Sequence, residues 1–288
     1  MSQTPSDRLL VAGIDVGTSA VKVVFMEDEG EAGAKVLLGQ RERIRRRDAH
    51  QVVSLFFDAC LTEAGLRRDD FDYIATTGEG EMAPFRTGHF YGMTTHARGA
   101  LFLDPEARAV LDIGALHARA ILMDERAKVL GNRMTSQCAS GSGQFLENIC
   151  RYLGITIEEI GPLSLEADNP EPCSSICAVL AETDVINMVS RGISTPNIIK
   201  GIHQSMAGRY MRLVSRLVSS FEGGGAVLVT GGLSADPGLL AALREEAEQA
   251  GLDVDIRAHP DSVLAGALGA ALWGAFRARK LAASGVAF

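Results

Sequence analysis

Apolar residues in the first half of the chain form short runs that are separated by turn residues. Runs of this kind, rich in Val, Ile and Leu, are typical of strands with at least one buried face. Apolar residues at helical spacing within Ala49–Gly65 predict a helix, for which Gly65 supplies a C-terminal stop. The predicted strands are Leu9–Val16, Val21–Met26, Lys35–Leu38, Asp72–Thr76, Ala109–Ile113, Ala118–Met123 and Val129–Met134.

After residue 140 the apolar residues change to helical spacing, with two further strands between the helices. Strands and helices are therefore mixed along the chain, which predicts the α/β fold class. The predicted helices are Gln144–Leu153, Val179–Arg191, Pro196–Phe221, Pro237–Gln249 and Ser262–Ala282, and the predicted strands are Ala226–Thr230 and Val254–Arg257.

A short pattern near the N-terminus occurs a second time further along the chain. The first copy reads Asp15-Val-Gly-Thr-Ser-Ala-Val-Lys22, and the second reads Asp112-Ile-Gly-Ala-Leu-His-Ala-Arg119. Each copy predicts a strand, a tight Asp-x-Gly turn and a second strand. One such turn is ordinary in a β-hairpin, but two in register indicate a duplicated lobe. We therefore predict two lobes, the first formed by residues 1–102 and 262–288 and the second by residues 103–261.

The duplicated hairpins predict a nucleotide site in the cleft between the lobes. Asp15 and Asp112 would face each other across the triphosphate, where two carboxylates can bind Mg²⁺ through its water shell and orient an attacking water. Glycines let backbone N–H groups approach phosphate oxygens. A buried strand that ends in Gly231-Gly232 adds a turn suited to an adenosine or α-phosphate. The residues expected to bind ATP are Gly13, Gly17, Thr18, Ser19, Lys22, Gly114, Gly231 and Gly232.

Composition and charge exclude several other classes of protein. The chain has 288 residues and a net charge of −8, so it has no basic excess to neutralise nucleic-acid phosphates. Residues 1–8 lack the basic and apolar regions of a secretory signal, and the apolar stretch Val263–Phe276 is too short to cross a bilayer. We expect a cytoplasmic protein with no nucleic-acid partner and no membrane partner.

The hairpin and glycine motifs resemble those of the ATPase superfamily that contains actin, Hsp70 and hexokinase. That resemblance extends over essentially the whole chain and implies a two-lobed, actin-like (ribonuclease H-like) fold. Two longer motifs restrict the resemblance to fewer members of this superfamily. The motifs are Ser136-Gln-Cys138-Ala-Ser-Gly-Ser-Gly-Gln-Phe145 and Ser174-Ser-Ile-Cys177-Ala-Val-Leu-Ala-Glu182. They are similar to the cysteine motifs of the ATPases that activate 2-hydroxyacyl-CoA dehydratases and of those in ATP-dependent benzoyl-CoA reductases.

The cysteines of these two motifs have a physical role consistent with the resemblance. Cys138 and Cys177 each precede a predicted helix, and a helix N-terminus favours the thiolate that iron requires. A [4Fe-4S] cluster needs four ligands, so a partner would supply the other two. The alternative is that both are merely buried thiols. We interpret Cys60 and Cys150 as buried thiols, because they fall within helical patterns, and leave the role of Cys173 open.

The resemblance implies an electron-transferring enzyme that hydrolyses ATP. In that family, hydrolysis drives low-potential electrons from a ferredoxin through the shared cluster to substrate-binding subunits, which reduce the benzoyl-CoA ring. The implied cofactors are ATP, Mg²⁺ and the [4Fe-4S] cluster. The implied partners are a homologous ATPase subunit, related by a pseudo-two-fold axis, the substrate-binding reductase subunits and the ferredoxin.

One motif departs from the pattern of the homodimeric activators. They carry Asp-Ile-Gly-Gly-Gln-Asp where this chain has Asp112-Ile-Gly-Ala115-Leu116-His117, a variant similar to the D-type ATPase subunits of the reductases. His117 either contacts phosphate or packs at a strand edge, and the efficiency of hydrolysis is open. The alternatives for the function of the chain are a homodimeric dehydratase activator, a small-molecule kinase of the same fold and an actin-like filament protein.

The basic run from Arg41 to Arg47 predicts a solvated strand edge, or a docking surface for an acidic ferredoxin or a sister subunit.

Overall fold

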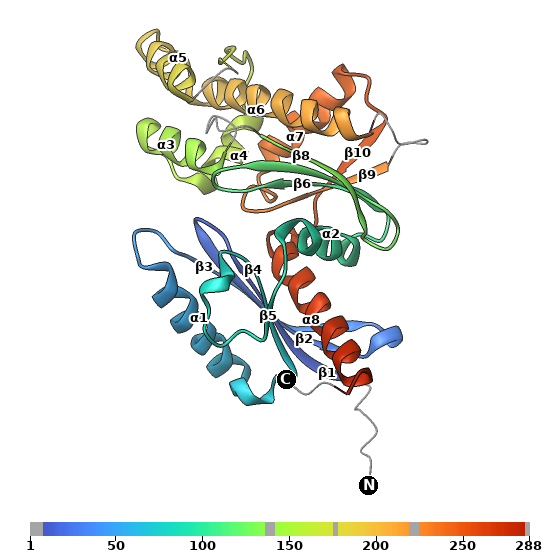
Figure 1. Ribbon diagram of the computed structural model, residues 1–288. Coiled ribbons are helices and arrows are strands. Elements are labelled where there is room, and N and C mark those ends of the chain that lie inside the picture. The colour runs from blue at the N-terminus through green and yellow to red at the C-terminus, as the bar shows by residue number, and fades with distance from the viewer. Residues whose placement is uncertain (1–7, 136–141, 175–177, 219–224, 286–288) are drawn as a thin grey trace. The chain divides into compact units, whose positions relative to one another are not determined.

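Two five-stranded sheets organise the computed structural model, which describes residues 8–135, 142–174, 178–218 and 225–285 (Figure 1). The chain divides into two compact units. Unit 1 consists of residues 1–103 with 264–288, and unit 2 consists of residues 104–263. Each unit is an α/β structure, so the predicted fold class is confirmed.

The sheet of unit 1 has the order β3-β2-β1-β4-β5. The first three strands are antiparallel neighbours, whereas β4 and β5 join them in parallel. Figure 1 shows α1 on one side of this sheet and α2 with α8 on the other. The elements are β1 (Leu9–Val16), β2 (Ala20–Asp28), β3 (Ala34–Arg43), α1 (Ala49–Ala64), β4 (Tyr73–Gly78), β5 (Gly88–His89), α2 (Gly92–Leu103) and α8 (Ala265–Ala283).

Side chains alternate between the two faces of β1. Ala12, Ile14 and Val16 belong to the apolar core on the α1 side, where Phe25 and Phe57 meet edge to face with ring centroids 5.6 Å apart. The intervening residues face α8. A Cβ on Gly13 would lie 1.9 Å from Ala267 O, so only glycine lets this helix approach the strand so closely. The next residue on that face is Asp15.

The sheet of unit 2 repeats this topology with the order β8-β7-β6-β9-β10. Here too, three antiparallel strands are followed by two parallel ones. One continuous apolar core joins this sheet to its helices. The elements are β6 (Ala107–Ile113), β7 (Ala118–Met123), β8 (Val129–Met134), α3 (Gly143–Leu153), α4 (Ile157–Leu165), α5 (Ala178–Ser190), α6 (Thr195–Val218), β9 (Gly225–Thr230), α7 (Pro237–Gln249) and β10 (Val254–Arg257).

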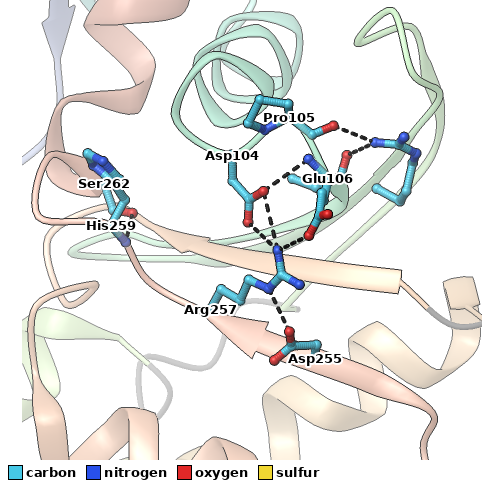
Figure 2. Close-up of polar contacts among 9 residues, drawn as sticks. Asp104, Pro105, Glu106, Asp255, Arg257, His259 and Ser262 are labelled. Carbon is cyan, nitrogen blue, oxygen red and sulfur yellow. Dashed lines mark hydrogen bonds and ion pairs between the residues drawn. The ribbon is translucent and has the colours of Figure 1, made fainter.

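The first residues of unit 2 are tied to the end of its last strand by one arginine (Figure 2). Arg257 Nη1 donates to Asp104 Oδ2 over 3.2 Å and to Glu106 Oε2 over 2.7 Å, and its Nε donates to Asp255 Oδ2 over 2.5 Å. Three carboxylates around one guanidinium leave this point acidic. The arginine therefore both links the two chain segments and neutralises part of their charge.

Helices α2 and α4 and the short strand β5 were not predicted. Helix α2 contains Gly92 and Gly99, and glycine is unfavourable within helices. Packing overrides this preference, because a Cβ on Gly99 would lie 1.9 Å from Ala265 O of α8. Helix α4 contains Gly161 and Pro162. Its Gly161 likewise allows close approach to Pro237 at the start of α7.

Two further sequence predictions concern the surface of the chain. Arg41 and Arg43 are exposed on β3, which is an edge strand of the described sheet, and this exposure agrees with both a solvated strand edge and a docking surface. In the described part of the chain, no helix combines the length and the apolar character that a membrane span requires.

Candidate functional site

The first predicted hairpin places Asp15 directly opposite Lys22. They are register partners on β1 and β2, and Lys22 Nζ donates to Asp15 Oδ2 over 2.9 Å. Both residues are buried. Their turn is closed by a hydrogen bond from Gly17 N to Ala20 O, and the next strand is fastened to it through Ile44 N and Ser19 O. Gly17, Thr18 and Ser19 thus form the tip of the hairpin beside a buried ion pair.

Burial by itself would raise the pKa of Asp15, since a carboxylate loses its hydration. The charges of Lys22 and His96 and the hydrogen bond from Lys22 outweigh that effect, so the pKa of Asp15 is lowered from its ordinary value. Asp15 is therefore ionised at neutral pH. An anionic oxygen ligand is what a hydrated Mg²⁺ ion prefers, so the residue suits the role predicted for it.

His96 is a neighbour of Asp15 that the sequence prediction missed. It lies on α2 and is buried. Its Nε2 and Asp15 Oδ2 each lie 2.9 Å from the position that a Cβ on Gly266 would occupy. No motif in the sequence marks this histidine, because the packing of α2 against α8 brings it to β1.

The second hairpin repeats the arrangement in unit 2. Asp112 on β6 and Arg119 on β7 are register partners, as Asp15 and Lys22 are in unit 1. Gly114 N donates to His117 O over 2.8 Å and closes the turn. Of the two alternatives for His117, the structure does not show packing at a strand edge, because the side chain is exposed in this turn. Contact between His117 and phosphate stays a prediction.

A glycine follows the parallel neighbour of each aspartate-bearing strand. Gly231 comes directly after Thr230, the register partner of Asp112, and has a φ of +87°. A Cβ there would lie 2.5 Å from Ile113 O and 2.7 Å from Asp112 Oδ1. In unit 1 Gly78, with a φ of +65°, occupies the equivalent place beside Asp15. The backbone at both places thus comes close to the carboxylate-bearing strand.

The Thr77-Gly78 pair was also missed by the sequence prediction, although a signal was present. Thr-Gly stands at the end of a buried strand at Thr77 and again at Thr230. The spacing between the two Thr-Gly pairs differs from the spacing between the two Asp-x-Gly motifs. A search for repeats at one fixed spacing therefore finds only the hairpins. Gly13, which was predicted to bind the nucleotide, lies against α8 in the structure.

Comparison with known proteins agrees with this geometry. The sequence model of the BadF/BadG/BcrA/BcrD ATPase family matches residues 12–274. The chain belongs to this family. It is 61% identical over 276 residues to the D-type subunit of benzoyl-CoA reductase of Thauera aromatica, which covers 96% of both chains. It is 34% identical to the activator of lactoyl-CoA dehydratase of Anaerotignum propionicum, over 93% of this chain and 98% of that protein.

A solved structure of the family has the same fold. The activator of 2-hydroxyisocaproyl-CoA dehydratase from Clostridium difficile, with bound ADPNP, superposes with a TM-score of 0.83. It is 28% identical in sequence, and the match covers 97% of this chain and 99% of that chain. The predicted actin-like ATPase fold is therefore confirmed.

The two cysteines predicted to bind iron, Cys138 and Cys177, lie outside the described residues. The helices predicted to follow them are present, as α3 from Gly143 and α5 from Ala178. Helix α3 is capped by Ser142, whose Oγ accepts from Phe145 N. Within the described ranges, no group of three or more His, Cys, Asp or Glu side chains is placed to hold a metal ion.

The described cysteines are thiols rather than thiolates. Cys60 and Cys150 are buried, as interpreted from the sequence, and burial raises their pKa to about 12 and about 11. Burial together with the charge of Asp184 raises the pKa of Cys173 to about 11. In the metal-free chain these three thiols therefore lose their protons less readily than an exposed cysteine does.

The segment that leads to Cys177 is fastened along one side of α6. Asn197 Oδ1 accepts from the backbone of Asp168 and Asn169, and a Cβ on Gly201 would lie 1.8 Å from Glu171 O. Ser205 Oγ then donates to Ser174 O over 3.2 Å. Asn197, Gly201 and Ser205 are four residues apart, so they share one face of the helix. The chain on the N-terminal side of Cys177 is thus held against a long buried helix.

Proposed function

We propose that this chain is the ATP-hydrolysing, electron-transferring subunit of a ferredoxin-dependent benzoyl-CoA reductase that acts in anaerobic degradation of aromatic compounds. The observation that carries the proposal is the 61% identity to the D-type subunit of such a reductase over 96% of both chains. The variant second hairpin, with Ala115, Leu116 and His117, points to the same type of subunit. The proposed location is the cytoplasm.

In this proposal both hairpins bind the phosphates of one ATP. Asp15 and Asp112 would hold a hydrated Mg²⁺ ion and orient the attacking water, while Lys22 would turn its charge toward the phosphates. Backbone N–H groups of the hairpin turns and of Gly231-Gly232 donate to phosphate oxygens, as the hydroxyls of Thr18 and Ser19 do. Mg²⁺, when bound, would neutralise the charge that develops on the phosphates. The buried ion pair of Asp15 with Lys22 supports this role, because it keeps both side chains beside the hairpin turn at Gly17.

Cys138 and Cys177 are proposed to ligate one half of a [4Fe-4S] cluster, and the homologous ATPase subunit would ligate the other half. When bound, the cluster would carry one electron at a time toward the substrate-binding subunits. The two helices α3 and α5 begin shortly after these cysteines, and their N-terminal partial charges favour thiolates. A ferredoxin is the proposed electron donor.

The test is the iron and acid-labile sulfide content of the chain, purified anaerobically after co-expression with its sister ATPase subunit. We expect a cluster in the wild type, its loss in the double variant Cys138→Ser with Cys177→Ser, and its retention in Cys173→Ser. The third protein is the matched control, because Cys173 is a nearby cysteine whose pKa is raised. Iron-free wild-type protein that still binds ATP would instead favour a small-molecule kinase.

A homodimeric dehydratase activator is the second candidate. It is supported by 34% identity to the lactoyl-CoA dehydratase activator, which is well below the identity to the reductase subunit. The two candidates differ in assembly. A chain that forms a cluster-bearing homodimer when it is expressed alone would be an activator, whereas the reductase subunit requires its sister subunit for cluster formation.

A further inference from the structure

Three polar side chains meet on the α8-facing side of β1 in unit 1. Lys22 Nζ lies 2.9 Å from Asp15 Oδ2, and His96 Nε2 and Asp15 Oδ2 each lie 2.9 Å from the position that a Cβ on Gly266 would occupy. All three residues are buried. Burying polar groups is costly unless they interact, so their gathering beside the predicted nucleotide hairpin calls for a functional explanation.

The backbone next to His96 is fixed by close packing. A Cβ on Gly269 would lie 1.7 Å from the carbonyl oxygen of Thr95, the residue that precedes His96, so α8 and α2 touch through their backbones at this point. The hydroxyl of Thr95 lies 3.1 Å from that of Thr77 at the end of β4, and both are fully buried. The imidazole therefore projects from a backbone that is fixed against both α8 and the sheet.

The ammonium group of Lys22 also lies close to the hairpin turn. Its Nζ lies 2.9 Å from the position of a Cβ on Gly17, which belongs to the hairpin turn proposed to bind phosphate. A flexible ammonium between a carboxylate and a phosphate site can turn toward the phosphate when a nucleotide binds. Asp15 would then lose the partner that holds it in the free chain.

We propose that His96 is a positioning residue for ATP hydrolysis, whose Nε2 holds the carboxylate of Asp15 in its working orientation when Lys22 has turned to the phosphates. The inference rests on the proposed ATPase function. His96 acts through Asp15 and touches neither the nucleotide nor the water. It therefore affects the chemical step more than nucleotide binding.

The test compares His96→Gln with His96→Asn. The amide nitrogen of Gln can occupy the place of Nε2, whereas that of Asn falls at the place of Nδ1, so the pair differs in reach but little in polarity. Hydrolysis is measured in the complex with the sister ATPase subunit, in which the sister's own first-hairpin aspartate is replaced by Ala. We expect His96→Asn to lower kcat about 100-fold with KM within about 2-fold, and His96→Gln to stay within about 5-fold of the wild type.

One control variant and the pattern of outcomes separate this inference from a structural role and from the proposed function. His50→Leu, at an exposed position on α1, is expected to hydrolyse ATP as the wild type does. Equal loss of kcat in His96→Gln and His96→Asn, or loss that follows a lowered Tm, would overturn the positioning role. So would wild-type kcat in His96→Asn. A wild type that binds no nucleotide, or that binds ADP without hydrolysing ATP, would refute the proposed function itself.

Discussion

Gln144 donates its backbone N–H to the carbonyl oxygen of Ala115 over 2.9 Å. The preceding Gly143 donates in the same way to Gly114 O over 3.1 Å. The first N–H groups of a helix have no partner within the helix, and here the second hairpin supplies acceptors for two of them. Helix α3 therefore begins on the hairpin proposed to bind phosphate, and a shift of that turn must move the start of the helix that follows Cys138.

This contact predicts that a branched side chain at position 143 weakens nucleotide binding. A Cβ on Gly143 would lie 3.5 Å from Ala115 Cα and from Gly114 O, which is ordinary contact. Gly143→Ala should therefore bind ADP as the wild type does. The branched side chain of Gly143→Val would press on the hairpin, and we expect affinity to fall about 10-fold. Calorimetric titration with ADP measures both, and equal affinities of the two variants would contradict the coupling.

A stronger effect is expected at Gly231. A Cβ there would meet Ile113 O at 2.5 Å and Asp112 Oδ1 at 2.7 Å, and the φ of +87° disfavours any side chain. Gly231→Ala should lower stability by about 2 kcal/mol or more and displace the Asp112 carboxylate. Thermal unfolding and ADP titration measure the two effects.

The adjacent Gly232 provides the matched control for that substitution. Nothing lies within 4 Å of the position of its Cβ, and its φ is not positive. Gly232→Ala should leave stability within about 0.5 kcal/mol of the wild type. If both variants unfolded at the same temperature, the tight contact at Gly231 would not be the reason why position 231 requires glycine.

The sequence predicts the parts of the fold that depend on local pattern. The strands Leu9–Val16 and Ala118–Met123 have the predicted limits, and the Asp15 and Lys22 pairing follows from a hairpin in register. Helix α2 escapes prediction because its glycines are poor helix formers in isolation. They are required only once α8, from the other end of the chain, packs against it.

In the candidate site, too, the residues set by local pattern can be predicted and those set by tertiary packing cannot. Residues within one hairpin, such as Asp15 and Gly17, can be found from spacing alone. His96 and Gly78 come from other elements, and only tertiary packing makes them neighbours of Asp15. For His117 the sequence left two alternatives open, and the structure places its side chain in an exposed turn between two strands. Long-range contacts thus account for most of what the sequence prediction missed.

The Arg257 cluster in Figure 2 predicts a salt-dependent stability. Replacing Arg257 by Gln leaves Asp104, Glu106 and Asp255 facing one another without a counter-charge. We expect a lower Tm than in the wild type at low ionic strength, and a smaller difference at about 1 M NaCl, where exposed charges are screened. Adding Glu106→Gln to the variant should restore part of the loss.

An exposed arginine elsewhere supplies the control for that experiment. Arg126 has a side chain that is 86% exposed, and it lies 4.0 Å from Glu125. Arg126→Gln should unfold at the wild-type temperature at either salt concentration, because an exposed pair contributes little. A salt-independent Tm difference for Arg257→Gln would mean that packing of its side chain, rather than its charge, holds the two segments.

Acid should weaken unit 2 through Asp236. This residue caps α7 by accepting from Leu239 N, and its Oδ2 lies 3.4 Å from Nε2 of the buried His203. Burial alone would raise the pKa of Asp236. The contacts with His203 and the backbone N–H groups of Leu239 and Gly238 outweigh it, so the pKa is lowered from 3.8. The stabilisation is complete above pH 3.8 and is lost as the pH falls through the lower, folded-state pKa.

Asp236→Asn tests this directly, because Asn can still cap the helix but carries no charge. We expect the variant to be less stable than the wild type by about 1–3 kcal/mol at pH 7, and the difference to shrink as the pH falls below 3.8. Denaturant unfolding between pH 3 and pH 7 measures it. Asp48→Asn, at the exposed cap of α1, is the control and should differ from the wild type by a small amount at every pH. A constant difference for Asp236→Asn across this range would mean that the carboxylate charge does not stabilise α7.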